Sequence, residues 1–305
     1  EIKLIHKYLH HQSVHLRMEV LSILCNSSKK SESLSKEELK LLMEFIVENL
    51  NIDSTAFQQL FLSQLRILFV RIRDSLVQEY RFKCKDAHLI PEHLLKSKNI
   101  HVQLNQPQLE FVNELAEIAV LNTFPGACFQ RRRISLHVLN IIFDVFVVSP
   151  LGQKRKEKPS KFVKQVIQVA QLQGLWNFFN DGSLINIFPC IIDYTDEIRA
   201  LTYDLMEFST WPGIYNDLPS EIVITYGFEL CSHPDYKSSE AGALLISLVY
   251  KKLYINNNMA KMGISFAIHF LSNIIERMES IEKNTMKVIT PSKETMGYLL
   301  AFNIA

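Results

Sequence analysis

The chain has 305 residues, of which 48% are hydrophobic and 21% are charged, and these shares exclude an intrinsically disordered protein. Its 9 Gly and 10 Pro residues are about half the number expected from average usage, so turns are few, which argues against a sandwich or barrel of many short strands. The formal net charge of +1 excludes a domain that binds nucleic acid over most of its surface, so any contact with RNA must be a local patch.

Apolar residues recur at every third or fourth position, which predicts helices from end to end. Ser35 and Glu38 form the capping-box pattern that marks a helix start, and an apolar stripe follows them. Thr55 and Gln58 repeat this pattern at the start of a helix of about seven turns that runs toward Tyr80. Further helices are predicted, in chain order, at 108–122, 129–148, 161–180, 183–192, 198–209, 219–231, 238–254 and 259–281.

Helix pairs that recur at about 40 to 47 residues are typical of HEAT and armadillo repeats. The clearest example here is 189–206, which resembles the HEAT pattern, with Asp193 in the turn and Ile198 and Arg199 opening the second helix. An Asp in the turn can accept hydrogen bonds from free N–H groups at the helix start, and the Arg can reach the acidic turn. We therefore predict an all-α fold, a HEAT/armadillo-like helical-repeat solenoid.

Residues 1–305 are expected to form one continuous α-solenoid segment, with possible sub-boundaries at the irregular connection 82–106 and the basic loop 149–160. Because the chain starts at Glu1 rather than Met and stops within an apolar stretch, we expect it to be part of a larger chain. Five widely spaced cysteines without a CxxC pair are typical of reduced thiols, and no apolar run reaches the roughly 18 to 20 residues that span a bilayer. These features predict a cytoplasmic protein without a membrane span.

The sequence lacks the common local motifs of enzymes. It contains no GxGxxG, GxxxxGK[ST], HExxH or GxSxG pattern, so we expect no catalytic residue, no metal and no cofactor in this chain. Histidines near the start include two pairs at i, i+4, a spacing that can hold a metal, but no further ligand lies at a matching short spacing, so ordinary surface histidines are favoured: His6, His10, His11 and His15. Cys128 is interpreted as a buried structural thiol.

Clusters of basic residues are the candidates for nucleic-acid binding. Guanidinium forks suit phosphate oxygens, and a line of them on one face of a solenoid could follow an RNA backbone. The candidates are Arg71, Arg73, Arg131, Arg132, Arg133, Lys154, Arg155, Lys156 and Lys158. The alternative that these are ordinary surface charges stays open, because three consecutive arginines spread over nearly a full helical turn and a Lys-rich loop is usually only solvated. The aromatic residues Trp176, Phe178 and Phe179 are predicted to pack in the core rather than to stack on bases.

Three stretches together resemble one known family. Residues 124–139 read FPGACFQRRRISLHVL, in which Phe124, Pro125, Gly126, Phe129, Arg131 or Arg132, and Leu136 match the pattern of the thyroid-adenoma-associated (THADA) family of very large HEAT-like proteins. Residues 58–80 and 196–206 resemble two further helices of that family, in the same order, and 292–302 faintly resembles the start of another of its domains. The resemblance extends over most of the middle of the chain.

The resemblance implies a function that composition and spacing do not. Members of this family act as the non-catalytic partner of an FtsJ-like methyltransferase that places a 2′-O-methyl group in the tRNA anticodon loop. S-adenosylmethionine would then be bound by the partner, and the solenoid would help to hold tRNA rather than DNA. Two classes of function therefore stay open: a tRNA-binding scaffold subunit, and a HEAT-repeat adaptor that binds proteins without direct RNA contact. No motif supports an enzyme.

Overall fold

The computed structural model describes residues 2–26, 32–83, 103–147, 160–209 and 221–255, together with Ile268, Ser272, Ile275 and Glu276. Within these residues the regular structure is helical, and no strand is present. The helices are α1 (Ile2–Leu9), α2 (Val14–Cys25), α3 (Lys36–Asn49), α4 (Thr55–Lys83), α6 (Gln106–Leu121), α7 (Phe129–Phe146), α8 (Lys161–Leu172), α9 (Asp181–Ile187), η1 (Phe188–Ile192, a 3₁₀ helix), α10 (Asp196–Ser209), α11 (Glu221–Cys231) and α12 (Tyr236–Ile255). The all-α class is confirmed.

The chain divides into two compact units, Glu1–Cys190 and Ile191–Ala305. Both sub-boundaries predicted from the sequence fall mainly on segments outside the described residues, and so does most of the helix predicted at 259–281. The segment 292–302, which carries part of the family resemblance, also lies outside them. No helix of the described residues is long and apolar enough to cross a membrane.

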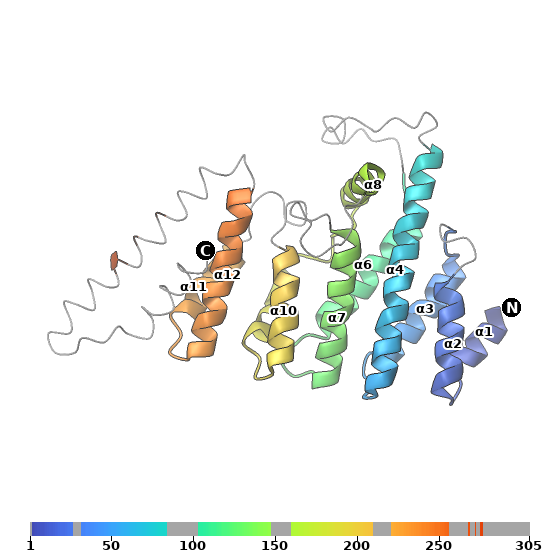
Figure 1. Ribbon diagram of the computed structural model, residues 1–305, viewed down its shortest axis with the longest axis horizontal. Coiled ribbons are helices and arrows are strands. Elements are labelled where there is room, and N and C mark those ends of the chain that lie inside the picture. The colour runs from blue at the N-terminus through green and yellow to red at the C-terminus, as the bar shows by residue number, and fades with distance from the viewer. Residues whose placement is uncertain are drawn as a thin grey trace. The chain divides into compact units, whose positions relative to one another are not determined.

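The first unit is built from two layers of helices. One layer consists of α2, α4 and α7, which lie side by side, and the other consists of α1, α3, α6 and α9, each in contact with the next (Figure 1). Contacts of α1 with α2 and of α6 with α7 join the layers, and α8 packs against α4. Helix pairs that stack in this way form an α-helical repeat, as the periodicity of the sequence predicts.

Local signals in the sequence explain where α3 and α4 begin. The Ser35 side chain accepts a hydrogen bond from the Glu38 N–H, and the Glu38 carboxylate accepts one from the Ser35 N–H, so the predicted capping box is confirmed. The start of α4 differs from the prediction, because Ser54 accepts the Phe57 N–H at 3.4 Å. Gln58 takes no part in a cap, since its side chain is buried and its amide donates to the Ile52 carbonyl at 2.6 Å.

The predicted helix 161–180 ends early, at Leu172, because of Gly174. This glycine has a φ of +100°, in the left-handed region that a glycine adopts without a steric cost. The Gly174 N–H donates to the Gln171 carbonyl and the Leu175 N–H to the Ala170 carbonyl, which together form a Schellman motif. The chain then turns back, and the aromatic residues that follow it enter the core.

Aromatic side chains form much of the core of the first unit. The rings of Phe45 and Phe57 lie 6.3 Å and 5.7 Å from that of Phe61. A second cluster surrounds Phe143 of α7, with ring centroids 5.0 to 6.2 Å away: Trp176, Phe178 and Phe179. These three residues are buried, so the prediction that they pack in the core is confirmed.

The second unit contains the repeat-like turn that the sequence predicts at Asp193. The buried Asp193 carboxylate accepts the Thr195 N–H at 2.9 Å. Arg199 donates to the Asp193 carbonyl at 2.5 Å and also pairs with Asp196. Both contacts expected of the HEAT-like pattern are therefore present. Further along, α11 and α12 pack closely. The absence of a side chain at Gly242 allows this approach, since a Cβ there would lie 2.5 Å from the Cys231 nitrogen.

Candidate nucleic-acid interface

The start of α7 carries the motif on which the family resemblance depends. The Phe124 to Gly126 segment forms the break between α6 and α7, closed by a hydrogen bond from the Ala127 N–H to the Phe124 carbonyl at 3.0 Å. Cys128 occupies the N-cap position of α7, but its side chain makes no cap hydrogen bond. The first turn of α7 therefore keeps the partial positive charge of a helix N-terminus without a side-chain acceptor from the cap residue.

The helical geometry separates the three consecutive arginines at this end. Arg131 is exposed, whereas Arg132 is only 6% exposed and lies within the packed layers. Arg133 is half-buried and donates a hydrogen bond to the Gln58 side chain of α4. Steps of about 100° per residue place neighbouring side chains on different faces, so the run presents two arginines, not three, to solvent.

A row of half-buried polar side chains runs along α7 beside α4. Its members recur at alternating steps of three and four, and we name them the α4–α7 polar stripe: Gln130, Arg133, His137, Asn140 and Asp144. The Gln58 amide of α4 donates to Gln130 at 3.0 Å, and Arg66 of α4 forms an ion pair with Asp144 at 2.5 Å. The periodicity on α7 could have been found in the sequence, but the partners on α4 could not, because only the packing of the two helices brings them together.

Arg71 is a structural residue of the packing between α2 and α4. It is only 7% exposed, and its guanidinium donates to the Leu24 carbonyl at 2.7 Å and to the Glu32 carbonyl at 3.1 Å. Burial also raises the pKa of the neighbouring Cys25 thiol to about 12, although the positive charge of Arg71 opposes that rise. In this position the Arg71 guanidinium could reach a phosphate only after the helices separate.

The other candidates from the sequence are in different surroundings. Arg73 is half-buried, and its Nε and Nη2 groups both donate to Oδ1 of its neighbour Asp74, at 3.0 and 2.8 Å. The basic loop lies outside the described residues, so the structure says nothing of Lys154, Arg155, Lys156 and Lys158. Arg131 and Arg133 thus both lie near the start of α7, but about 200° apart around the helix axis, and Arg73 lies on α4.

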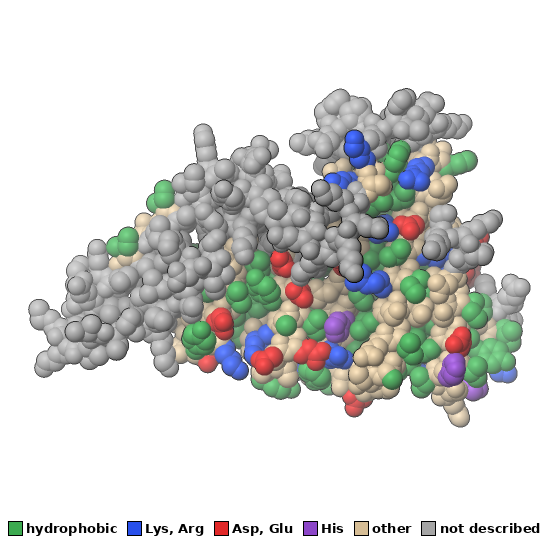
Figure 2. All heavy atoms as spheres, viewed as in Figure 1, with side chains coloured by type: hydrophobic (Ala, Val, Ile, Leu, Met, Phe, Trp, Pro, Cys, Tyr) green, Lys and Arg blue, Asp and Glu red, His purple; other side chains and the backbone are tan. Residues whose placement is uncertain are grey.

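Basic residues also gather where the end of α4 meets the start of α8. The Arg81 guanidinium lies over the Phe162 ring at 4.9 Å, and Lys161 and Lys164 are exposed in the first turn of α8. Figure 2 shows Lys and Arg side chains over the upper part of the view, where Figure 1 places α8 and the end of α4. The sequence analysis missed the two lysines, although their i, i+3 spacing directly after a basic loop is a recognisable signal.

The histidines and Cys128 form no metal site in the part of the chain that the structure describes. The His6 and His10 rings lie 4.6 Å apart, and His10 faces Glu48 at 3.1 Å. No group of three or more His, Cys, Asp or Glu side chains in the described ranges could hold a metal. The prediction that Cys128 is buried is wrong: it is exposed and lies 2.8 Å from the Asn51 side chain, because the break before α7 leaves it at the surface.

The stacked helix pairs define an α-helical repeat protein. A family model described as Trm732, TPR repeats, matches residues 1–173, which is more than half of the 305 residues, so the chain belongs to this family. The matched region lies within the first compact unit and includes α4, α7 and their polar stripe.

Several curated relatives are named "tRNA (32-2′-O)-methyltransferase regulator THADA". The dog protein is 26% identical over 199 residues, the human protein 27% over 196 and the chicken protein 24% over 198. Each match covers 64% of this chain and 9% of the relative, so the chain spans about a tenth of the length of these proteins. Among solved structures, a designed armadillo repeat protein in complex with a (KR)4 peptide aligns over 100% of this chain and 99% of its own, with a TM-score of 0.34 and 11% identity.

Proposed function

We propose that this chain is part of a non-catalytic regulatory subunit that binds tRNA, an FtsJ-like methyltransferase, or both, for 2′-O-ribose methylation of the tRNA anticodon loop. The observation that carries this proposal is membership of the Trm732 family together with relatives that are named as regulators of a tRNA 2′-O-methyltransferase. In this proposal the methyltransferase binds S-adenosylmethionine, the nucleic acid is tRNA rather than DNA, and the complex works in the cytoplasm.

The start of α7 is the proposed tRNA contact within this chain. Arg131 is exposed in the first turn of α7, and Arg133 is half-buried in the turn that follows. A helix N-terminus and arginine forks both favour phosphate oxygens. The amide and imidazole groups of the α4–α7 polar stripe would extend this contact, since polar side chains can bind the sugar hydroxyls that distinguish RNA from DNA.

Binding of purified tRNA to the full-length protein, with and without the methyltransferase, tests this proposal. The variant Arg131→Glu, Arg133→Glu should weaken tRNA binding about tenfold or more at low salt. It should also reduce the slope of log K against log salt by about one to two, because fewer counterions are released. Arg132 is left unchanged, since a charge reversal at a buried position would destabilise the fold.

The matched control is Lys7→Glu, Lys237→Glu, which reverses two exposed positive charges on α1 and α12. It makes the same change in net charge and should leave tRNA binding unaltered. Equal loss in both variants would indicate a general effect of net charge and contradict the assignment to α7. Unchanged binding in the α7 variant would contradict it as well.

A further inference from the structure

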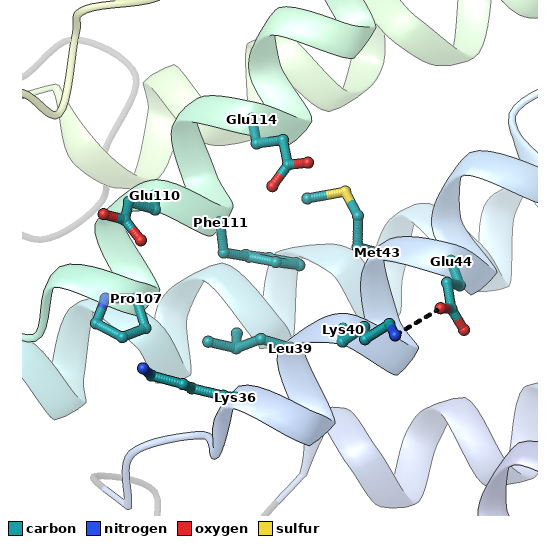
Figure 3. Close-up of a pocket in the computed structure, with 9 residues that line it drawn as sticks. All are labelled: Lys36, Leu39, Lys40, Met43, Glu44, Pro107, Glu110, Phe111 and Glu114. Atoms are coloured by element: carbon teal, nitrogen blue, oxygen red, sulfur yellow. Dashed lines mark ion pairs between the residues drawn. The ribbon is translucent and has the colours of Figure 1, made fainter.

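A groove of about 430 Å³ lies between α3 and α6, in the layer that does not carry the polar stripe. Its floor is apolar. Leu39 and Phe111 are buried there, and Met43 is half-buried and extends into the space between the two helices (Figure 3). A concave apolar floor of this kind is suited to receive two or three side chains of a ligand.

The two walls of the groove carry opposite net charges. Lys36 and Lys40 lie along the α3 wall, and Glu110 and Glu114 lie along the α6 wall; all four are exposed (Figure 3). Lys40 forms an i, i+4 ion pair with Glu44 at 3.9 Å. The two side chains are 79% and 40% exposed, so this pair contributes little to the stability of the fold. Among the described residues, the other three charged groups of the walls form no ion pair.

This combination of charge and apolar surface selects the class of ligand. The carboxylates of Glu110 and Glu114 would repel the phosphates of a nucleic acid, and the apolar floor offers no hydrogen bonds to bases. A polypeptide can place apolar side chains on the floor and charges of both signs at the walls. The α3 wall from Lys36 to Glu44 is about 12 Å long at 1.5 Å per residue, which matches about two turns of a helix in the groove.

We infer that the α3–α6 groove binds a short amphipathic helix of a protein partner. The helix would carry apolar anchors at i and i+3 or i+4, with acidic residues on the flank that faces Lys36 and Lys40 and basic residues on the flank that faces Glu110 and Glu114. The groove would therefore add a protein-docking surface that is separate from the start of α7. This inference goes beyond the proposed tRNA-related function and stands without it.

Synthetic helical peptides of about four turns, binding to the full-length protein and followed by fluorescence anisotropy, provide the test. All the peptides share the same leucine anchors. One peptide has a glutamate flank and a lysine flank, one has glutamates on both flanks, and one has lysines on both. The mixed peptide should bind about tenfold more tightly than either of the others, in the one direction along the groove that places its glutamate flank on Lys36 and Lys40, because only then does no flank meet a wall of like charge.

Changing one wall should change the preferred peptide. Glu110→Lys, Glu114→Lys makes both walls basic and should shift the preference to the all-glutamate peptide, whereas Lys36→Glu, Lys40→Glu should shift it to the all-lysine peptide. Met43→Asp should weaken binding of all three about tenfold or more, because it places a charge on the apolar floor. Circular dichroism and thermal unfolding of each variant verify that the fold is intact.

The matched control is Glu37→Lys, Glu117→Lys. Both residues are exposed on the same two helices but do not line the groove, and the change in net charge equals that of the α6 wall variant. The control should keep the preference for the mixed peptide. Absence of binding by the mixed peptide, or an equal switch in the control, would overturn the inference. Loss of tRNA binding in the α3 wall variant with unchanged peptide binding would also overturn it and assign the groove to RNA. The peptide titrations contain no tRNA, so their outcome is independent of the proposed function.

Discussion

Arg71 on α4 and Arg131 on α7 belong to similar runs of basic and apolar residues, but the structure gives them different surroundings. Arg71 is buried and donates to two backbone carbonyls, at Leu24 and Glu32, which ties α4 to the end of α2. Arg131 is exposed in the first turn of α7. A buried guanidinium must use its donors within the protein, since an unsatisfied buried charge is costly, whereas an exposed one keeps its donors for a ligand. Residue type alone therefore does not identify an RNA contact.

The largest expected effect tests the structural side of this comparison. Arg71→Met keeps most of the apolar stem but removes both hydrogen bonds, so it should lower the free energy of unfolding by about 3 kcal/mol. Arg131→Met should change it by less than about 0.5 kcal/mol. Urea denaturation of the two variants measures the difference. Equal stabilities would mean that Arg71 is not needed for the packing of α2 against α4.

A pH titration tests the same buried region. The pKa of Cys25 in the folded protein is about 12, above the ordinary value of 9.0, so above about pH 9 the thiol ionises more readily in the unfolded chain, and the wild type should lose stability as the pH rises. Cys25→Ala removes this effect. Raising the pH from 8 to 10 should therefore lower the unfolding free energy of the wild type by about 1 kcal/mol more than that of the variant.

A thiol reagent provides an independent measurement of that region. Exposed Cys128 should be modified in the native protein, whereas buried Cys25 should react only on unfolding. The comparison is made in a Cys84→Ser background, because Cys84 lies outside the described residues and its modification would overlap with that of the other two thiols. Rapid modification of Cys25 in the native state would contradict the burial on which the pH effect depends.

The contact between Arg133 and Gln58 should contribute less to the unfolding free energy than the buried Arg71 does. This pair joins α7 to α4 and is partly buried, so a double-mutant cycle with Arg133→Met and Gln58→Leu should give a coupling energy of about 1 kcal/mol. Chemical denaturation of the four proteins in the cycle measures it. Additive effects of the two substitutions would show that α7 does not depend on α4 for the position of this arginine.

The smallest expected effect is that of the ion pair between Arg66 and Asp144. The Arg66 side chain is 55% exposed, and exposed pairs contribute little in water, so Arg66→Ala should lower the unfolding free energy by less than about 0.5 kcal/mol. The effect should disappear at high salt. A loss above 1 kcal/mol would place this pair with the structural arginines rather than with the surface ones.

The parts of the fold that depend on short-range patterns could be predicted from the sequence. The capping box at Ser35 is an example, because its two hydrogen bonds join residues only three positions apart. The end of α8 was missed, although Gly174 was a local signal, because the apolar residues after it continue the helical spacing. The turn at Asp193 was recognised from residues within six positions of one another.

The candidate interface was only partly predictable. Its arginines could be found as a basic run, but their exposure could not, since it depends on which helices become neighbours. Cys128 and Arg71 show this in opposite directions: the cysteine expected to be buried is exposed, and one of the arginines proposed to contact RNA is buried. Lys161 and Lys164 have a spacing that could have been noticed in the sequence, but only the packing of α8 against α4 places them beside the end of α4.

By itself the sequence determined that the protein is helical, where most helices begin, and which family it resembles, because these properties depend on residue spacing and on interactions within one or two turns. Only the tertiary structure decided which charged groups reach solvent, that polar groups of α4 meet the stripe on α7, and that α3 and α6 enclose a groove with walls of opposite charge. The physical reason is that burial and charge pairing arise from contacts between helices that are far apart in the chain.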